Sequence, residues 1–323
     1  MWKSACPEPV YRVESCMSAA RIAVVTSDAG VKYDVDLPLI VDALHTQGLA
    51  AQAVAWDADD VAWDRFDLAV IRSTWDYAER LDEFLAWADA TARVTGLWNP
   101  APVVRWNSDK HYLLELAERD VSVVPTQFIE PGGRFSEGDF DQADGVVVKP
   151  AVSAGARDTA RYEPGRHADA ARHARILLDQ GRTVMIQPYL RLVEEGERAL
   201  VFFGDTFSHA IRKGPVLTTP GVIDNFRDAH PGAAPYRPTE AEIQTALAAL
   251  DAVPSAAAPL FTRVDLALNE TRDPVVMELE LIEPNLFLAS TPHGLVRFVE
   301  AVAAESRTTP AQGLARPSDD RWR

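Results

Sequence analysis

The sequence predicts an α/β protein made of a parallel α/β lobe followed by two lobes of mixed α+β structure. Two observations lead to this prediction. Between residues 21 and 94, short apolar segments alternate with amphipathic helical segments, which is typical of a parallel sheet covered by helices on both faces. Further along the chain, apolar segments occur in pairs separated by turn residues, which favours antiparallel strands.

The length of 323 residues is sufficient for two domains or three small lobes. Met17 stands just before the first apolar segment, so the residues up to that point are expected to be a disordered extension. The C-terminal end is rich in Pro, Arg and Asp and is expected to be a flexible tail. The expected parts are an extension over 1–20, an α/β lobe over 21–107, a small central lobe over 108–187, a C-terminal lobe over 188–305 and a tail over 306–323.

The first lobe is expected to contain three strands and two helices. RIAVVTSD is a compact apolar segment that ends in polar residues, and Gly48 is a typical helix stop. Phe84, Leu85 and Ala88 recur at helical spacing on one face. The expected strands are Arg21–Asp28, Ala51–Trp56 and Leu68–Arg72, and the expected helices are Pro38–Gln47 and Leu81–Val94.

The later lobes carry helix-capping signals between apolar segments. The polar residues Asn107–Asp109 are each able to cap a helix over Lys110–Arg119. Thr239 and Glu242 have the spacing of a capping box, which predicts a helix reaching Val253. The other expected elements are strands at Val121–Ile129, Gly145–Lys149, Val184–Pro188, Arg198–Phe203, Asp205–Lys213, Phe261–Leu268 and Val275–Ile282, a helix at Ala168–Gln180 and a long loop over 214–238.

The composition disfavours several classes of function. Lys and Arg total 32 against 48 Asp and Glu, and the net charge of −16 disfavours nucleic acids and anionic membranes as partners. The two cysteines, Cys6 and Cys16, precede the first strand, so no disulfide framework and no Cys-ligated zinc site is expected. No apolar run reaches the roughly 18 residues that span a bilayer, and the N-terminus lacks a signal-peptide core, so a cytoplasmic location is expected.

Two lysines are candidate phosphate ligands. Lys149 ends an expected strand beside a loop of small residues that includes Ser153 and Gly155, and Lys110 lies in the first turn of an expected helix. A lysine at a strand end can meet a phosphate as a point charge, and backbone N–H groups of a small-residue loop can approach an anion closely. The alternative is two surface lysines beside an ordinary loop.

A second candidate region joins an apolar strand to an acidic loop. The strand reaches Gln187, and Tyr189 and Leu190 follow, so that backbone edges there could face a flat base. A carboxylate from the next loop, Glu194, Glu195 or Glu197, could accept hydrogen bonds from ribose hydroxyls. The alternative is an acidic turn on a solvated surface.

The last two expected strands carry an unusual density of acidic side chains. Asp265 lies on an apolar strand with Arg263, while Glu280, Glu283 and Asn285 lie near the end of the next strand. Buried carboxylates cost several kcal/mol unless they are paired or bind a cation. An all-oxygen set of this kind suits Mg²⁺. A salt-bridged, half-exposed pair of strands is the alternative.

Weaker candidates lie at two other strand ends. The third strand ends in IRSTWDY, where open α/β sheets hold ligand-contacting loops, although its aromatic residues could equally pack the lobe. Arg212 and Lys213 end a later strand and could meet a γ-phosphate or form a solvated pair. The candidate substrate residues at these two ends are Arg72, Trp75, Asp76, Tyr77 and Arg212.

The order of these motifs resembles the ATP-grasp superfamily, and its glutathione-synthetase-like branch above all, from about Arg21 to Glu305. The resemblance implies two α+β lobes that sandwich the nucleotide, with ATP and two Mg²⁺ ions as cofactors. It implies phosphate ligands Lys110, Lys149, Ser153 and Gly155, an adenine hinge at Gln187, Tyr189 and Leu190, a ribose acid at Glu197 or Glu194, metal ligands Asp265, Glu283, Asn285 and Glu280, and catalytic Arg198, Arg263 and Lys213.

Three stretches, RSTWDY, NSDK and ELELIEPN, are together most similar to the cyclo-ligases that form D-cycloserine. This resemblance implies that the carboxylate of O-ureido-D-serine is activated as an acyl phosphate and closed into an amide within the same molecule, releasing ADP, phosphate, CO₂ and ammonia. The chain departs from the superfamily pattern in having one glycine in the loop after Lys149 and additional acids at Glu278 and Glu280, either of which could replace Asn285.

Other functions stay open at this point. An intermolecular carboxylate–amine ligase differs only in requiring a second substrate, and a non-catalytic nucleotide-binding protein would share the fold. An NAD-dependent oxidoreductase is disfavoured because no G-x-G-x-x-G follows the first strand. The expected partner is a small amino-acid-like molecule, and the sequence is compatible with a homo-oligomer.

Overall fold

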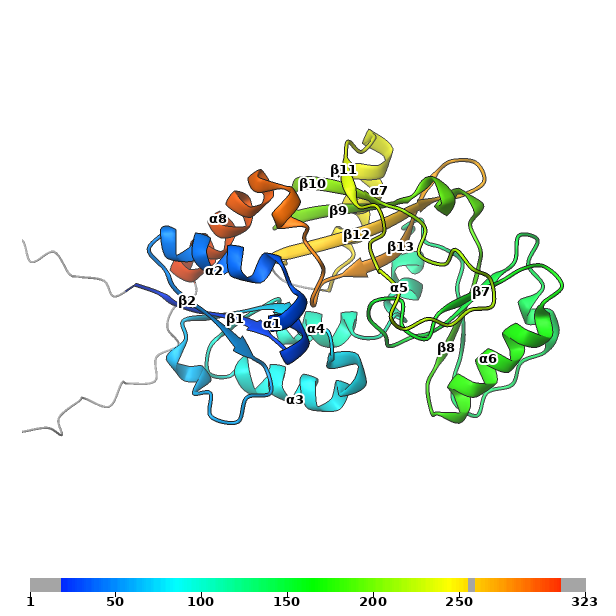
Figure 1. Cartoon of the computed structure of the whole chain (residues 1–323), viewed down its shortest axis with the longest axis horizontal. Coiled ribbons are helices and arrows are strands. Elements are labelled where there is room, and N and C mark those ends of the chain that lie inside the picture. Colours follow the sequence, from blue (N-terminus) through cyan, green and yellow to red (C-terminus); the bar gives the residue numbers. More distant parts are fainter. Residues whose placement is uncertain (1–18, 255–258, 309–323) are drawn as a thin grey trace, which may run out of the picture.

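The computed structural model describes residues 19–254 and 259–308, which form three β-sheets with helices packed against them (Figure 1). One sheet is parallel and the other two are antiparallel, which confirms the predicted α/β class with separate mixed lobes. The residue boundaries of the predicted lobes stay a prediction. Most of the expected N-terminal extension and C-terminal tail lie outside the described residues.

The parallel sheet has the strand order β2-β1-β3-β4. Side chains of α2 cover one face, and those of α3 and α4 cover the other, so β1 and β3 are buried on both sides. The strands are β1 (Arg21–Thr26), β2 (Ala50–Ala55), β3 (Leu68–Ser73) and β4 (Gly96–Trp98), and the helices are α1 (Asp28–Tyr33), α2 (Asp36–Thr46), α3 (Leu81–Thr91) and α4 (Ala101–Asn107).

The first strand ends earlier than its sequence predicts. The Ser27 side chain accepts a hydrogen bond from the Gly30 N–H at 3.1 Å and so caps α1, a helix that the sequence analysis did not anticipate. Only glycine fits at position 30, because a Cβ on this residue would lie 2.3 Å from the Ser73 carbonyl oxygen. This close approach holds α1 against the end of β3.

The small antiparallel sheet has the order β5-β8-β6-β7, and α6 (His167–Asp179) packs its apolar side against it. Its strands are β5 (Gln127–Ile129), β6 (Val146–Pro150), β7 (Ala160–Tyr162) and β8 (Val184–Pro188). The strand predicted from Val121 is therefore mostly wrong. Ser122 and Val124 instead exchange backbone hydrogen bonds with Val276, on the edge of the large sheet.

The five-stranded antiparallel sheet has the order β11-β10-β9-β12-β13 and lies across the upper part of Figure 1. The predicted capping box of Thr239 and Glu242 is confirmed at the start of α7, which covers the apolar face of this sheet. The strands are β9 (Glu197–Phe203), β10 (Thr206–Lys213), β11 (Ala234–Tyr236), β12 (Phe261–Leu268) and β13 (Pro274–Glu280), and the helices are α5 (Tyr112–Glu118), α7 (Glu240–Asp251) and α8 (Pro292–Thr308).

Helix α8 joins two of the sheets. Phe298 and Val302 pack into one apolar cluster with Ile40 of α2 and Phe203 of β9. The helix continues to Thr308, so the first residues of the expected tail are helical. Short 3₁₀ helices lie at Trp63–Arg65, Tyr77–Glu79, Glu137–Phe140, Arg191–Glu195 and Leu288–Ser290. Among the helices of the described ranges, none is long and apolar enough to cross a membrane.

The predicted helix caps at Asn107–Asp109 are wrong, because α5 begins only at Tyr112 without a side-chain cap, and Asn107 bonds to the sheet instead. Asn107 ends α4, and its amide donates to the Leu279 carbonyl at 2.7 Å and accepts from the Leu281 N–H at 2.8 Å. The Tyr112 hydroxyl accepts from the Leu279 N–H at 3.0 Å. These side chains take the place of a further strand along the edge of β13, whose backbone groups are buried and need partners.

Candidate active site

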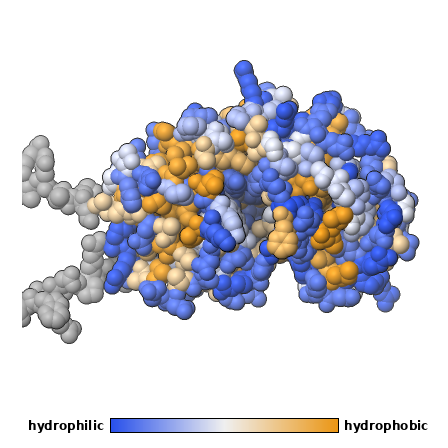
Figure 2. All heavy atoms as spheres, in the orientation of Figure 1, coloured by the Kyte–Doolittle hydropathy of each residue, from blue (hydrophilic) through white to orange (hydrophobic). Residues whose placement is uncertain are grey.

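A cavity of about 800 Å³ lies between the three sheets. Tyr77 lines it from the first lobe, Lys149 and Gln187 from the small sheet, and Lys213 and Asp265 from the large sheet. Figure 2 shows this face of the molecule recessed between the body that holds the parallel sheet and the body that holds the small sheet. The cavity thus unites segments that are far apart in the sequence.

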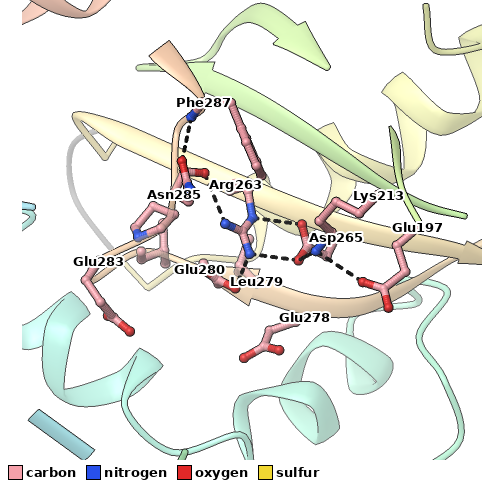
Figure 3. Close-up of polar contacts among 12 residues, drawn as sticks. Glu197, Lys213, Arg263, Asp265, Glu278, Leu279, Glu280, Glu283, Asn285 and Phe287 are labelled. Atoms are coloured by element: carbon pink, nitrogen blue, oxygen red, sulfur yellow. Dashed lines mark hydrogen bonds and ion pairs between the residues drawn. The ribbon is translucent and has the colours of Figure 1, made fainter. Parts of the chain in front are cut away.

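One face of the large sheet forms a charged wall of the cavity. Strand register places Glu197 directly opposite Lys213, and Asp265 shares their face from the neighbouring strand β12. The Lys213 Nζ lies 2.7 Å from Asp265 Oδ2 and 3.1 Å from Glu197 Oε2 (Figure 3). Burial alone would lower the pKa of Lys213, but the two carboxylates raise it, so this buried lysine is positively charged.

Arg263 binds the same carboxylate from the other side. Its guanidinium donates to both oxygens of Asp265 at 2.9 Å and pairs with Glu280, while Nη1 donates to the Asn285 carbonyl at 3.0 Å. Burial alone would raise the pKa of Asp265, but Arg263 and Lys213 hold it well below its usual range. The result is a fixed array of charges that needs no reorganisation when a ligand arrives.

Glu280 and Glu283, two further carboxylates of the cavity, are not fully neutralised by the cations around them. Burial raises the pKa of Glu280 to about 7 and raises that of Glu283 well above its usual range, with the neighbouring carboxylates adding to both shifts. For Glu278, burial is outweighed by Lys110 and Lys149, which lower its pKa. A further cation entering the cavity would therefore be stabilised by Glu280 and Glu283.

The two candidate phosphate lysines meet at one end of this wall. Lys110 lies in the turn between α4 and α5 rather than inside a helix, and its Nζ is 2.8 Å from the Ser153 carbonyl and 3.1 Å from Glu278. Lys149 is the second-last residue of β6 and is buried, which lowers its pKa. Ser153 and Gly155 both line the cavity, and Gly155 has a φ of +62°, a conformation that favours glycine.

The predicted adenine-side residues also reach the cavity. Gln187, Tyr189 and Leu190 line it, and the Gln187 side-chain amide donates to the Thr126 hydroxyl at 2.8 Å. Of the two candidate ribose acids, Glu197 lines the cavity. Glu194 does not, and 63% of its side chain is exposed to solvent.

Two predicted arginines point the other way. Side chains alternate across a strand, so Arg198 and Arg212 lie on the face opposite Glu197 and Lys213. Arg198 is buried there, with Nε 3.3 Å from Glu242 of α7, and Arg212 is exposed. The structure therefore does not place Arg198 at the cavity as a catalytic group or Arg212 there as a substrate ligand.

The IRSTWDY segment places some of its residues at the cavity and others away from it. Trp75 and Tyr77 line the cavity, and the Trp75 indole N–H lies 3.4 Å from the Glu283 carbonyl. Asp76 accepts from the Trp56 indole and does not reach the cavity lining. Arg72, which we expected to bind a substrate carboxylate, is sealed in the protein with Asp34 and Asp36 and donates to the Pro284 carbonyl.

The long loop over 214–238 supplies residues that the sequence analysis did not name. Phe226, Arg227 and His230 line the cavity. The loop is fastened to the small lobe by two hydrogen bonds between Asn225 and Asp158, at 2.8 and 2.9 Å. Its unusual length was the only signal in the sequence that pointed to this role.

The predicted magnesium ligands offer the oxygen atoms that Mg²⁺ prefers, but the structure does not gather them around one point. Within the described part of the chain, no group of three His, Cys, Asp or Glu side chains is placed to hold a metal ion. Figure 3 shows Glu283 apart from Asp265, and the Asn285 side-chain oxygen accepts from the Phe287 N–H at 2.8 Å. Glu278, opposite Asp265 on β13, is the better placed neighbour. These oxygens fit Mg²⁺ if phosphate oxygens complete the set.

Comparison with known proteins places the chain among relatives of the same architecture. Residues 22–99 match the family described as "D-cycloserine synthetase DcsG, N-terminal domain". The cycloserine biosynthesis protein DcsG of Streptomyces lavendulae is 37% identical over 294 residues, which cover 87% of this chain and 97% of that protein. The crystal structure of D-cycloserine synthetase DcsG matches with a TM-score of 0.81 and 34% identity, covering 89% of this chain and all of that one.

More distant structures share the fold. The D-alanine–D-alanine ligase of Bacillus anthracis complexed with ATP matches with a TM-score of 0.65 at 13% identity, covering 91% of this chain and 100% of that chain. The RimK domain ATP-grasp protein of Sphaerobacter thermophilus matches with a TM-score of 0.60 at 18% identity, covering 87% and 98% of the two chains.

The fold and the charged cavity define an ATP-grasp ligase. This class of enzyme uses ATP to join a carboxylate to a nucleophile. Within it, the chain belongs to the DcsG family, as its identity and coverage with the Streptomyces lavendulae protein establish.

Proposed function

We propose that this ligase acts in cycloserine biosynthesis and closes O-ureido-D-serine to D-cycloserine. The carboxylate is activated as an acyl phosphate by ATP, and a nitrogen of the same molecule attacks it. ADP, phosphate, CO₂ and ammonia are the other products, and one water is consumed. The observation that carries the proposal is family membership over nearly the whole length of the DcsG protein, together with a cavity whose charged wall suits phosphoryl transfer.

The cavity residues support the activation step. Lys110 and Lys149 would hold nucleotide phosphates as point charges, and Arg263 would face the transferred group. Asp265, Glu278 and Glu280 would hold Mg²⁺, with Glu283 and Asn285 as the further candidates, and the ion would offset charge that develops on the phosphates. Tyr77, a buried residue of the cavity wall, would help to exclude water from an acyl phosphate that water would otherwise hydrolyse.

Ring closure within one molecule needs no second binding site. Holding the carboxylate and the nitrogen together makes the reaction intramolecular, which contributes several kcal/mol to the rate. We therefore expect a small amino-acid-like substrate as the partner, and neither nucleic acid nor a membrane. The cytoplasm, where ATP is supplied, is the expected location.

The deciding experiment supplies Mg-ATP and O-ureido-D-serine as the only substrates and follows ADP and cycloserine together. Equal release of the two products supports the cyclo-ligase. ADP and amide product only after an added amine would instead identify an intermolecular ligase. ATP binding without any ADP would be the behaviour of a non-catalytic nucleotide-binding protein.

The metal ligands have a separate test. We expect Glu283→Ala to abolish ADP formation, and normal turnover in that variant would remove Glu283 from the set. Glu278→Gln is the matched comparison, because Glu278 rather than Glu283 lies opposite Asp265. Thermal stabilisation by Mg-ATP, compared with ATP alone, reports binding in both variants without relying on turnover.

A further inference from the structure

The loop that follows Lys149, residues 151–159, has a strained backbone; we name it the phosphate loop. Ala156 has a φ of +56° and Asp158 a φ of +52°, with Gly155 at +62° beside them. Residues with a Cβ rarely adopt this conformation, so it persists only where the surrounding structure holds it. Most residues of the loop line the cavity, so this shape decides how the loop meets a bound ligand.

The contacts that hold this shape include one residue from a different part of the chain. Asn225 lies in the long loop over 214–238, 67 residues beyond Asp158. Its side-chain oxygen accepts from the Asp158 N–H at 2.8 Å, and its side-chain amide donates to the Asp158 carboxylate at 2.9 Å. A single asparagine therefore binds both the backbone and the side chain of a residue with a positive φ.

Asp158 accepts these hydrogen bonds as an ionised carboxylate. Burial alone would raise the pKa of Asp158, but the hydrogen bonds from Arg182 and Asn225 lower it. The Arg182 Nη1 atom donates to the second carboxylate oxygen at 2.6 Å. Hydrogen bonds to a charged group are stronger than those between neutral groups. Arg182 belongs to the same lobe as the phosphate loop, whereas the contact from Asn225 depends on the long loop.

The long loop docks on the small lobe at neighbouring points as well. The Arg227 Nη2 atom donates to the Thr159 carbonyl at 3.3 Å, and the Gly221 N–H donates to the Arg161 carbonyl at 2.7 Å. Asn225 and Arg227 also line the cavity. The phosphate loop therefore has its observed shape while the long loop is docked against it.

We propose that Asn225 is a positioning residue that holds the phosphate loop in the conformation that binds ATP. When the long loop docks, Asn225 fixes the backbone at Asp158, and the strained loop keeps the shape in which it lines the cavity. ATP binding and docking of the long loop therefore favour each other, as linkage requires. This inference rests on the proposed function, in which the phosphates of ATP bind beside Lys149.

The first test measures the affinity for Mg-ATP by isothermal titration calorimetry in Asn225→Ala. The affinity should fall by about tenfold, because the loss of two hydrogen bonds leaves fewer molecules with a binding-competent loop. The midpoint of thermal unfolding without ligand should stay near that of wild type. Trypsin should cleave faster after Arg157, a residue of the phosphate loop whose side chain is 46% exposed. A general loss of stability would shift the midpoint instead.

The matched control is Asn269→Ala. Asn269 also accepts a backbone N–H at 2.8 Å, from Asp273, but it lies between β12 and β13 and does not line the cavity. This variant should keep the wild-type affinity for Mg-ATP and the wild-type rate of cleavage after Arg157.

An exchange of the two partners tests whether Asn225 acts through Asp158. Asn225→Asp alone brings two carboxylates together and should weaken Mg-ATP binding. Adding Asp158→Asn supplies an amide that can donate to the new carboxylate, and asparagine tolerates a positive φ, so the affinity should recover. These two variants also provide the test if Asn225→Ala does not fold.

The outcomes that contradict the inference differ from those that contradict the reaction. An unchanged Mg-ATP affinity in folded Asn225→Ala, or an equal loss in Asn269→Ala, would overturn the role of Asn225. Failure of Asp158→Asn to restore binding would show that Asn225 does not act through Asp158. A wild-type enzyme that binds Mg-ATP but forms no cycloserine from O-ureido-D-serine would refute only the proposed reaction.

Discussion

Two buried arginines in this protein sit at the centre of carboxylate clusters, and the two clusters differ in what they face. Arg72 binds Asp34 and Asp36 at 3.1 and 3.0 Å. Arg263 binds Asp265, which Lys213 also contacts. The first cluster is sealed between the parallel sheet and the chain at Pro284, whereas the second lines the cavity.

The sealed cluster of Arg72, Asp34 and Asp36 forms its hydrogen bonds with other groups of the protein. The Asp36 carboxylate accepts from the backbone N–H groups of Leu288 and Ala289, at 3.0 and 2.7 Å, and Arg72 donates to a backbone carbonyl. The cluster therefore fixes the segment that follows β13 against the first lobe. The open cluster has neighbours with surplus charge, such as Glu280, and so can still bind a ligand. Buried charge alone does not identify an active site; access to a cavity does.

The largest expected effect comes from the open cluster. Asp265→Asn keeps the shape but leaves Arg263 and Lys213 without their shared carboxylate. We expect ADP formation to fall by about 100- to 1,000-fold, as for the loss of a preorganised electrostatic group. The measurement is ADP release with Mg-ATP and O-ureido-D-serine.

Asp34→Asn is the matched change in the sealed cluster. It should alter stability while leaving ADP formation per folded molecule within a few-fold of wild type. If the two variants lost activity equally, the distinction between a structural and a functional cluster would be wrong.

The next effect concerns stability. Arg72→Met leaves Asp34 and Asp36 buried without a cation, which should cost about 3–5 kcal/mol of unfolding free energy. Urea unfolding followed by far-UV circular dichroism measures this loss. Arg72→Lys keeps the charge and should lose less, and a loss below about 1 kcal/mol in Arg72→Met would contradict the sealed arrangement.

A smaller loss is expected at the edge of β13. Asn107→Ala leaves a buried carbonyl and a buried N–H of that edge without partners, which should cost about 1–3 kcal/mol. Ser108→Ala removes a hydroxyl that only donates to the Arg105 carbonyl at 2.9 Å and should cost less. Equal losses in the two variants, measured by the same urea titration, would favour the helix-cap interpretation of the sequence.

The smallest expected effect is a pH dependence from the small lobe. Burial lowers the pKa of His173 to about 4, whereas an unfolded histidine titrates near 6.5. As the pH falls through that range, the unfolded chain binds a proton before the folded chain does, so stability falls with pH. The expected loss is about 1 kcal/mol at pH 5.5 relative to pH 7.5. His173→Gln should flatten this part of the stability curve, and an unchanged slope would assign it to other groups.

Much of the fold could be predicted from local patterns. The strands at Leu68–Ser73 and Phe261–Leu268 are rich in apolar residues, and the structure buries both on two faces. The capping box at Thr239 was predicted because its partners are three residues apart. Helix α4 and the role of Asn107 were not predicted, since the partner of Asn107 is a strand edge more than 170 residues away.

The residues of the candidate site can also be separated into those that local sequence patterns predict and those that they do not. Glu278 and Glu280 are two residues apart in an expected strand, which predicts that they share a face, and the structure sets both on the cavity wall with Asp265. Arg198 could not be assigned correctly from its neighbours, because the register of β9 against β10 and β12 decides which face meets the cavity. His230 was missed since nothing in a loop sequence indicates where its residues come to lie.

The sequence by itself determined the α/β class, most strands, the supply of lysines and carboxylates, and the resemblance to ATP-grasp ligases. These properties depend on residues near one another in the chain, where periodicity and turn chemistry act. Only the tertiary structure decided that Arg72 is sealed and Arg263 lines the cavity, that Arg198 faces α7, and that the loop after Lys213 brings His230 to the cavity. The physical reason is that burial and electrostatic pairing depend on distance in space, which the order of residues does not specify.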